Sequence, residues 1–465
     1  MSDLLKSTVN EGGYCIGCGA CASYSGSPFQ MKFDEFGKFV AAASRPTSIS
    51  DNGVSSLCPF SKDATNEDAL AKSLFSPDCS QDSGLGSYLD IFAGYVAADG
   101  FRKRASSGGG VSWFLSELLS RGQVDGVIHV RSRLPSTGSS PLVEYGISTT
   151  AEEIAAGAKS KYYPVEISKV IQQVRDRPGR YVFVGIPCFI KAVRLLTAAD
   201  DALRARIIFC VGIVCGHLKS AKYAEMFGWQ LGIRPGNLHS FDFRVKMPGF
   251  NASSYAVQAE GVIEDEVVKL RAPAHLFFGY DWGVGLFKYK ACDFCDDVFA
   301  ETADISFGDA WLDNYDKDWK GNNVVVVRNS QCLKLIKEGI QSGALQFERL
   351  SSAKAVESQS AGLRHRRQGL AYRLQLADRN NEWRPSKRVQ AGNGKLGFRE
   401  RRKYRLRSLM ASLSHRAFQQ AVAADDFHVF VRQMQPLIEK YRQSLKPSLW
   451  KRCLGRLFRI LKRAR

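Results

Sequence analysis

The residues of this sequence that most clearly carry chemistry are the cysteines of the run Cys15-Ile-Gly-Cys18-Gly-Ala-Cys21. A further cysteine, Cys58, stands apart from this run and precedes Pro59. Three thiolates at a two-residue spacing, with a fourth held at a distance, are typical ligands of a cubane [4Fe–4S] cluster. We therefore predict one such cluster, bound by Cys15, Cys18, Cys21 and Cys58, with electron transfer as its chemistry.

Alternatives remain open at this first site. Ser25 stands where the two-cluster ferredoxin run continues with a cysteine, which argues for a single cluster in this segment. Cys79 is a lower-ranked candidate for the fourth ligand. Tetrahedral zinc also uses C-x2-C pairs, but zinc sites usually combine two separate pairs, so we favour the cluster.

Four later cysteines form a second candidate set. Cys188 and Cys215 each follow a β-branched run, and Cys292 and Cys295 form a C-x2-C pair. Because open α/β sheets place their sites at the carboxyl ends of parallel strands, we expect the first two at one end of a sheet. Four sulfurs suffice for a second [4Fe–4S] cluster, whereas a lone cysteine after an apolar strand is often only a small buried residue.

The elements that must position these cysteines follow an α/β pattern. Between about 88 and 345, β-branched runs alternate with helical segments, which predicts a mainly parallel sheet. Strands are predicted at 124–130, 181–184, 207–214, 305–307 and 324–327, and helices at 111–120, 168–175 and 189–196. A hairpin is predicted at 31–40. We divide the chain into a ferredoxin-like module at 1–80, a two-part body at 85–175 and 176–345, and a helical basic region at 346–465.

Charge is distributed unevenly along the 465 residues. The net charge is +19, yet residues 361–465 hold 27 Lys and Arg against 6 Asp and Glu, so the rest of the chain is near neutral. The sequence has no apolar run of transmembrane length, and 12 cysteines, several in ligand spacing, are typical of metal chemistry in a reducing compartment. We therefore expect a cytoplasmic protein.

Two basic stretches suggest contacts with partners. Residues 447–465 form an amphipathic pattern with Trp450 and Phe458 on the apolar side, which suits peripheral contact with an anionic membrane at its inner face. Nucleic-acid binding is the less favoured alternative, and a solvated or oligomer-packing helix competes with both. The run at 364–372 is too dense in charge for a core, so we expect it to face an acidic substrate or partner.

Three motifs resemble a known family. Gly185-Ile-Pro-Cys188, the pair of Cys292 and Cys295 followed by Asp296, and the run from Ala303 to Trp311 are similar to the β-subunit family of coenzyme F420 hydrogenases and dehydrogenases. The resemblance covers about residues 85–345, and the family is similar to reductases of the chlorophyll pathway. It implies FAD, one or two [4Fe–4S] clusters, and electron passage between the clusters and a flavin that exchanges hydride with a substrate or deazaflavin.

Candidate flavin contacts lie in three segments. Small residues open the helix predicted at 111–120, where amide groups and the helix dipole would favour a phosphate; they are Ser106, Ser107, Gly108 and Gly109. An ordinary N-cap loop is the alternative there. In the segment from Lys159 to Tyr163, Lys161 would neutralise a phosphate or the reduced flavin, and Tyr162 would stack on a ring, with Ser160 beside them. Asp309 would point into the same crevice, or cap a helix.

His217 and Lys219 are the candidate catalytic residues, because a proton donor beside the hydride-accepting centre needs a pKa near neutrality. A lone histidine is more often structural. The most favoured function is an iron–sulfur flavoprotein oxidoreductase that uses a redox partner protein or a small-molecule electron donor or acceptor, and oligomer formation is compatible with it. The alternative is a non-enzymatic module stabilised by zinc or one cluster, acting at an anionic membrane or on nucleic acid.

Overall fold

An eight-stranded sheet forms the centre of the protein, in a computed structural model that describes residues 9–43, 53–98, 100–133, 141–392, 394 and 396–446. In spatial order, its strands are β15 (Leu345–Arg349), β5 (Asp90–Val96), β14 (Asn323–Val327), β13 (Ile305–Asp309), β9 (Ile207–Ile213), β8 (Tyr181–Gly185), β6 (Gly126–Ser132) and β7 (Val143–Ser148). The central strands β13, β9, β8 and β6 are parallel neighbours, and antiparallel pairs flank them on both sides. The carboxyl ends of the four central strands therefore meet at one end of the sheet.

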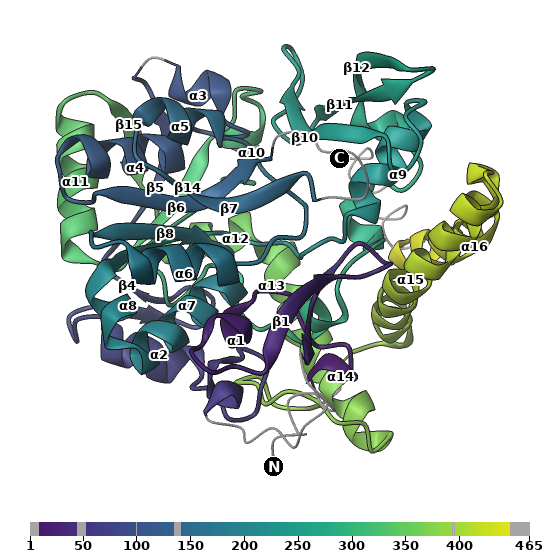
Figure 1. Ribbon diagram of the computed structural model, residues 1–465, viewed down its shortest axis with the longest axis horizontal. Helices are drawn as coiled ribbons and strands as arrows, with labels where there is room; N and C mark the ends of the chain where they lie inside the picture. The colour runs from purple at the N-terminus through teal and green to yellow at the C-terminus, as the bar shows by residue number, and fades with distance from the viewer. Residues whose placement is uncertain are drawn as a thin grey trace, which may run out of the picture.

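Helices cover both faces of this sheet (Figure 1). One face packs against α4 (Gly110–Ser120) and α11 (Ser330–Gln341). The other face packs against α6 (Ser168–Asp176), α7 (Pro187–Ala199) and α8 (Asp201–Arg206). Every residue of β14 is buried, as is typical of a strand in a sheet that is covered on both sides.

The N-terminal segment forms a small module against the second of these faces. Its elements are α1 (Ala20–Ser23), β1 (Phe29–Phe33), β2 (Phe39–Ala43), the 3-10 helix η2 (Val54–Leu57), α2 (Glu67–Leu74), β3 (Ser80–Asp82) and β4 (Gly86–Tyr88). β1 and β2 pair as an antiparallel hairpin, which confirms the hairpin predicted at 31–40. The amide of Ile167, at the start of α6, donates to the carbonyl of Cys18 at 2.8 Å, so the module is attached directly to the body.

A three-stranded antiparallel sheet extends from the body and was not predicted. It consists of β10 (Leu238–Lys246), β11 (Tyr255–Ile263) and β12 (Glu266–Pro273). α9 (Lys222–Gln230) precedes this sheet, and η3 (Ala274–Leu276), η4 (Trp282–Val284) and η5 (Lys290–Phe294) follow it. The remaining short helices lie between elements of the body and are α3 (Phe101–Arg104), α5 (Ala151–Ala156) and α10 (Asp313–Asp316). The meander was missed because its strands are only half-buried, so their apolar pattern is weak.

In the part of the chain that the structure describes, five helices follow the central sheet and are called the C-terminal helices below. They are α12 (Ser352–Ser358), α13 (Ser360–Arg366), α14 (Gln368–Arg379), α15 (Phe398–Ala423) and α16 (Phe427–Leu445). α15 and α16 pair side by side, on the opposite side of the molecule from α11 (Figure 1). Residues 447–465, for which membrane contact was predicted, lie outside the described residues.

The observed fold agrees with the predicted class and differs from the prediction in how some strands pair. The α/β class and the helical C-terminal region are confirmed, and all five predicted strands and three predicted helices correspond to observed elements. The parallel pairing is limited to the central strands, because β14 returns antiparallel beside β13. Within the described ranges, no helix combines the length and apolar character needed to cross a bilayer.

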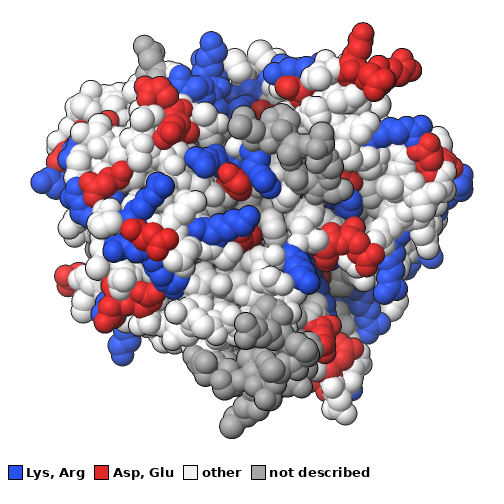
Figure 2. Space-filling model, in the orientation of Figure 1, with Lys and Arg blue, Asp and Glu red and all other residues white. Residues whose placement is uncertain are grey.

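The prediction for the charged run at 364–372 is wrong in part. His365, Arg366 and Tyr372 are at most 4% exposed and lie inside the protein, whereas Arg364 is exposed. Its positive charges are accommodated because acidic groups and thiols of the body face it, as described below. Elsewhere on the visible surface, Lys and Arg are interspersed with Asp and Glu (Figure 2).

Candidate functional site

The structure brings the four N-terminal cysteines together around one small cavity. Cys15, Cys18, Cys21 and Cys58, called the N-terminal cysteine group below, all line it. Burial raises the pKa of each thiol, to about 12 for Cys58, and the charges of neighbouring thiols in the group add to this effect for Cys18 and Cys21. Cluster assembly at such a site must therefore release protons.

Backbone geometry around this group explains its glycines. Gly17 has a φ of +69°, and a Cβ there would lie 2.3 Å from the carbonyl oxygen of Phe39 in β2. The amide of Gly17 is thereby free to donate to the sulfur of Cys15, at 3.4 Å. Amide donors to cluster sulfurs are one way in which proteins tune a cluster.

Cys79, the lower-ranked fourth ligand, lies elsewhere. Its sulfur is 3.7 Å from the carbonyl oxygen of Arg328, and it does not line the cavity of the N-terminal cysteine group. Cys58 reaches that cavity from the end of η2, where its amide donates to Ser55. The arrangement thus favours Cys58 over Cys79 as the fourth cluster ligand.

The four later cysteines also converge, and are called the second cysteine group below. Cys188 lies in the first turn of α7, Cys215 follows β9, and Cys292 and Cys295 lie in and after η5. Electrostatic interaction with the other three thiols, together with burial as the largest cause, raises the pKa of Cys188 well above its usual value. Leu218 donates its amide to the sulfur of Cys292 at 3.2 Å.

The two cysteine groups are neighbours. The thiol of Cys188 also interacts electrostatically with that of Cys18 in the N-terminal cysteine group. The buried ring of Tyr145 adjoins both thiols, and its hydroxyl donates to the carbonyl oxygen of Val184 at 3.0 Å. Electrons held by one group would therefore be adjacent to the other.

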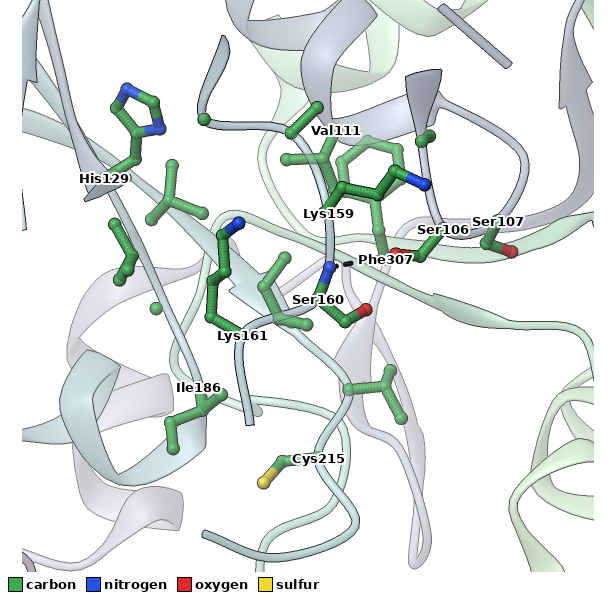
Figure 3. Close-up of a pocket in the computed structure, with 18 of the residues that line it drawn as sticks. Ser106, Ser107, Val111, His129, Lys159, Ser160, Lys161, Ile186, Cys215 and Phe307 are labelled. Atoms are coloured by element: carbon green, nitrogen blue, oxygen red, sulfur yellow. Dashed lines mark hydrogen bonds between the residues drawn. The ribbon is translucent and has the colours of Figure 1, made fainter. Parts of the chain in front are cut away.

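A cavity of about 280 Å³ opens beside the second cysteine group, at the carboxyl ends of the central strands. Cys215 lines it, and so do predicted flavin and catalytic residues, namely Ser106, Ser107, Gly109, Ser160, Lys161, Tyr162, His217 and Asp309. Figure 3 shows Cys215 on one side of this cavity and the serine and lysine side chains on another. Gly108 is not in the lining, because it packs against the backbone of Gly94 and Asn323.

The start of α4 forms a polar wall of the cavity. Gly109 precedes this helix with a φ of +88°, which favours glycine, and the hydroxyl of Ser106 accepts a hydrogen bond from the amide of Ser160 at 2.9 Å (Figure 3). Ser107 instead donates its hydroxyl to the carbonyl oxygen of Asn322, at 2.8 Å. The N-terminal end of an 11-residue helix therefore faces the cavity, where its dipole would favour an anion.

Two lysines lie on the loop that faces this helix. Lys159 has a φ of +106°, a strained conformation for a residue with a side chain, and its ammonium group pairs with Asp242 at 3.1 Å. Lys161 points between His129 and Ser160 (Figure 3), and burial lowers its pKa. An anion in the cavity would compensate the buried charge of Lys161.

The aromatic and acidic candidates are held by other side chains. Tyr162 contacts the rings of Trp282 and Phe243, with centroids 4.7 and 5.3 Å away. The carboxylate of Asp309 forms an ion pair with the guanidinium of the buried Arg244, on β10, at an N–O distance of 2.6 Å. The alternative of Asp309 as a helix cap is not seen, since α10 begins later, at Asp313.

The two candidate catalytic residues separate in the structure. His217 lines the cavity and stacks on Trp282 with centroids 4.2 Å apart, and burial holds its pKa well below the usual range. Lys219 does not line the cavity; its ammonium group donates to the carbonyl oxygen of Leu286 at 2.6 Å. Only His217 is therefore in position to meet a bound molecule.

Comparison with known proteins identifies a family for the body of the chain. Residues 91–172 match the family described as the N-terminal part of the coenzyme F420 hydrogenase/dehydrogenase beta subunit, and residues 179–353 match the family described as its C-terminal part. The chain belongs to this family. Membership of this family identifies the protein as an oxidoreductase.

Two individual proteins are similar to it. An uncharacterized protein of Methanocaldococcus jannaschii is 23% identical over 255 residues, which are 54% of this chain and 85% of that one. A chain in a structure of the F420-reducing [NiFe] hydrogenase complex from Methanosarcina barkeri is 16% identical, with a TM-score of 0.46. That match covers 68% of this chain and 100% of the other.

Residues beyond the matched region also reach the site, and sequence analysis missed them. Asp293, inside the C-x2-C loop, accepts hydrogen bonds from Lys288 at 2.5 Å and from Ser408 at 3.0 Å, and His365 lies 3.2 Å from it. The guanidinium of Arg373 donates to its carbonyl oxygen at 2.6 Å. The C-terminal helices thus hold in place the loop that carries Cys292 and Cys295.

The next acidic residue of the loop is held in the same way. Asp296 accepts the amide of Arg388 at 3.1 Å and lies 3.7 Å from the ammonium group of Lys387. Arg388 also donates to Glu301 at 2.6 Å. The surplus of Lys and Arg at 361–465 indicates that some of these side chains need acidic partners in the body. The sequence does not show which acidic residues those partners are.

Zinc has no candidate site in the described ranges. No three His, Cys, Asp or Glu side chains there are grouped closely enough to hold a single metal ion. The sulfurs of a tetrahedral zinc site lie about 3.8 Å apart, given Zn–S bonds of about 2.3 Å. Ligands of a cubane bind four different irons and therefore lie farther apart from one another.

Proposed function

We propose that this protein is an iron–sulfur flavoprotein oxidoreductase that passes electrons between two [4Fe–4S] clusters and FAD. Hydride exchange with a small substrate or a deazaflavin-like coenzyme would complete the reaction. The observation that carries this proposal is the position of Cys215, which both belongs to the second cysteine group and lines the cavity. Electrons at that group would therefore be at the wall of the space in which a flavin would bind.

The donor sets fit the proposed clusters. Each cysteine group offers four thiols, and all eight are free of disulfides. The clusters, when bound, would carry single electrons, and the FAD would convert them to a hydride. The role of the chain would be to hold the second cysteine group near both the N-terminal cysteine group and the cavity.

The cavity residues fit a dinucleotide cofactor with a pyrophosphate. The start of α4 would face the phosphates together with Ser106 and Lys161, and Gly109 would keep the backbone close to them, while Gly108 packs behind this wall. Ser107 and Ser160 would support this loop, while Tyr162 and Asp309 would border the ring side. Both α4 and the lysine loop lie in the part at 85–175.

Proton exchange would fall to His217 in this proposal, because its imidazole borders the cavity next to Cys215. We do not retain Lys219 in this role, since its ammonium group is held by Leu286 away from the cavity. Electrons would enter or leave through a redox partner protein or a small molecule, with the module at 1–80 as the port. The part at 176–345 would hold the second cluster.

Replacing Lys161 with alanine tests the flavin site. Loss of one charge-assisted contact to a phosphate is expected to weaken FAD binding about 10- to 100-fold, since such contacts contribute about 1.5–3 kcal/mol. Titration of the flavin-free protein with FAD, followed by flavin fluorescence, measures this without any substrate.

Lys159→Ala is the matched control, because its ammonium group already pairs with Asp242. It should weaken FAD binding much less than Lys161→Ala. Equal binding by the wild type and Lys161→Ala would contradict the proposed flavin site.

A further inference from the structure

Arg366 is a buried cation at the second cysteine group that comes from outside the family region. It is the last residue of α13, it is 1% exposed, and it lies beyond residue 353, where the family match ends. Its guanidinium interacts electrostatically with the thiols of Cys295, Cys215 and Cys292, and most closely with the first two. The arginine therefore faces three of the four predicted ligands.

No carboxylate balances this charge among the residues that the structure describes. Two other buried arginines have one: Arg194 pairs with Asp304 at 2.7 Å, and Arg244 with Asp309 at 2.6 Å. Arg366 has no such ion pair, and its Nε and Nη1 atoms are buried without a hydrogen-bond partner. A buried charge without compensation is strongly unfavourable, so an anionic partner is expected next to it.

The neighbouring residues keep this guanidinium in place. On either side of it along the chain, His365 lies 3.2 Å from Asp293, and Arg367 donates to the carbonyl oxygen of Asp296. Both acidic residues belong to the segment that carries Cys292 and Cys295. The end of α13 is therefore fixed to the cysteine loop at two points, with Arg366 between them.

We propose that Arg366 is a positioning residue that supplies a fixed positive charge to the second [4Fe–4S] cluster and raises its reduction potential. The inference rests on the proposed function, because it requires a cluster at the second cysteine group. When that cluster takes one electron from the N-terminal cluster, its net charge becomes more negative by one, and no bond forms or breaks. A nearby cation stabilises the reduced form more than the oxidised form, which favours electron transfer from the N-terminal cluster to the second cluster.

The test is a redox titration of the full-length protein, purified without oxygen and followed by electron paramagnetic resonance. Arg366→Gln should lower the midpoint potential of one of the two clusters by about 59 mV or more, which is a tenfold change in a one-electron equilibrium. Arg366→Lys should lower it less, because it keeps the charge. Arg364→Gln is the matched control: it removes the same charge from an exposed position of the same helix and should leave both potentials unchanged.

Iron content separates failure of this inference from failure of the proposed function. If the wild type holds no cluster that depends on Cys292, the proposed function fails and the inference with it. If Arg366→Gln keeps full iron and its potentials are unchanged, the inference alone is overturned. Should Arg366→Gln lose about half of its iron, retention by Arg366→Lys would support the requirement for a charge, and equal loss by both would overturn it.

Discussion

Serine in place of both Cys292 and Cys295 is expected to remove about four irons from a protein that holds about eight, because each [4Fe–4S] cluster binds four. The flavin should remain, since neither cysteine lines the large cavity. Reduction of the flavin by a donor that acts through the N-terminal cluster should stop, because the second cysteine group is the one near both the N-terminal cysteine group and the cavity. Iron, sulfide and flavin analysis, with stopped-flow absorbance for flavin reduction, measures these effects.

Cys332→Ser is the matched control for this double substitution. Cys332 is 1% exposed and so more buried than Cys292, but it lies in α11 and outside both cysteine groups. It should keep full iron content and flavin reduction. Unchanged iron in the double serine variant would end the assignment of a cluster to the second cysteine group.

Cys58→Ser is expected to remove the other cluster. The four thiols of the N-terminal cysteine group line one small cavity, so loss of one ligand should leave an unstable three-sulfur site. Iron should again fall by about half, with the second cluster and the flavin still present. The variant should no longer accept electrons from the external donor, while chemical reduction of its flavin should remain normal.

Cys79→Ser provides the comparison, because Cys79 was the competing fourth ligand and its sulfur lies near the carbonyl oxygen of Arg328 instead. It should keep both clusters. Full iron in Cys58→Ser together with loss in Cys79→Ser would reverse the assignment of the fourth ligand.

Local patterns made much of this site predictable. Cys188 and Cys215 could be placed at the end of a sheet because each directly follows a buried strand, and β8 and β9 are indeed parallel neighbours. The small residues before α4 could be assigned to a cavity for the same reason, since a helix start after a strand faces that end of the sheet. These inferences need only a few adjacent residues and the rules of α/β packing.

The contacts of the C-terminal helices could not be predicted, because they join residues far apart in the sequence. His365 and Asp293 are 72 positions apart, and neither has a partner in its own segment that reveals the pairing. A run as charged as 364–372 normally faces solvent, and His365 and Arg366 of this run are buried where Asp293 and the cysteines supply opposite charge or sulfur. Lys219 was misplaced in a similar way, since adjacency to His217 in sequence did not put both side chains on the cavity.

In the proposed function, this one chain holds two [4Fe–4S] clusters and one FAD close to one another. The most direct measurement is the iron, acid-labile sulfide, zinc and flavin content of the full-length protein purified without oxygen. The proposed function predicts a brown protein with about eight irons, as many sulfides and one FAD per chain. Stoichiometric zinc with no flavin would contradict it.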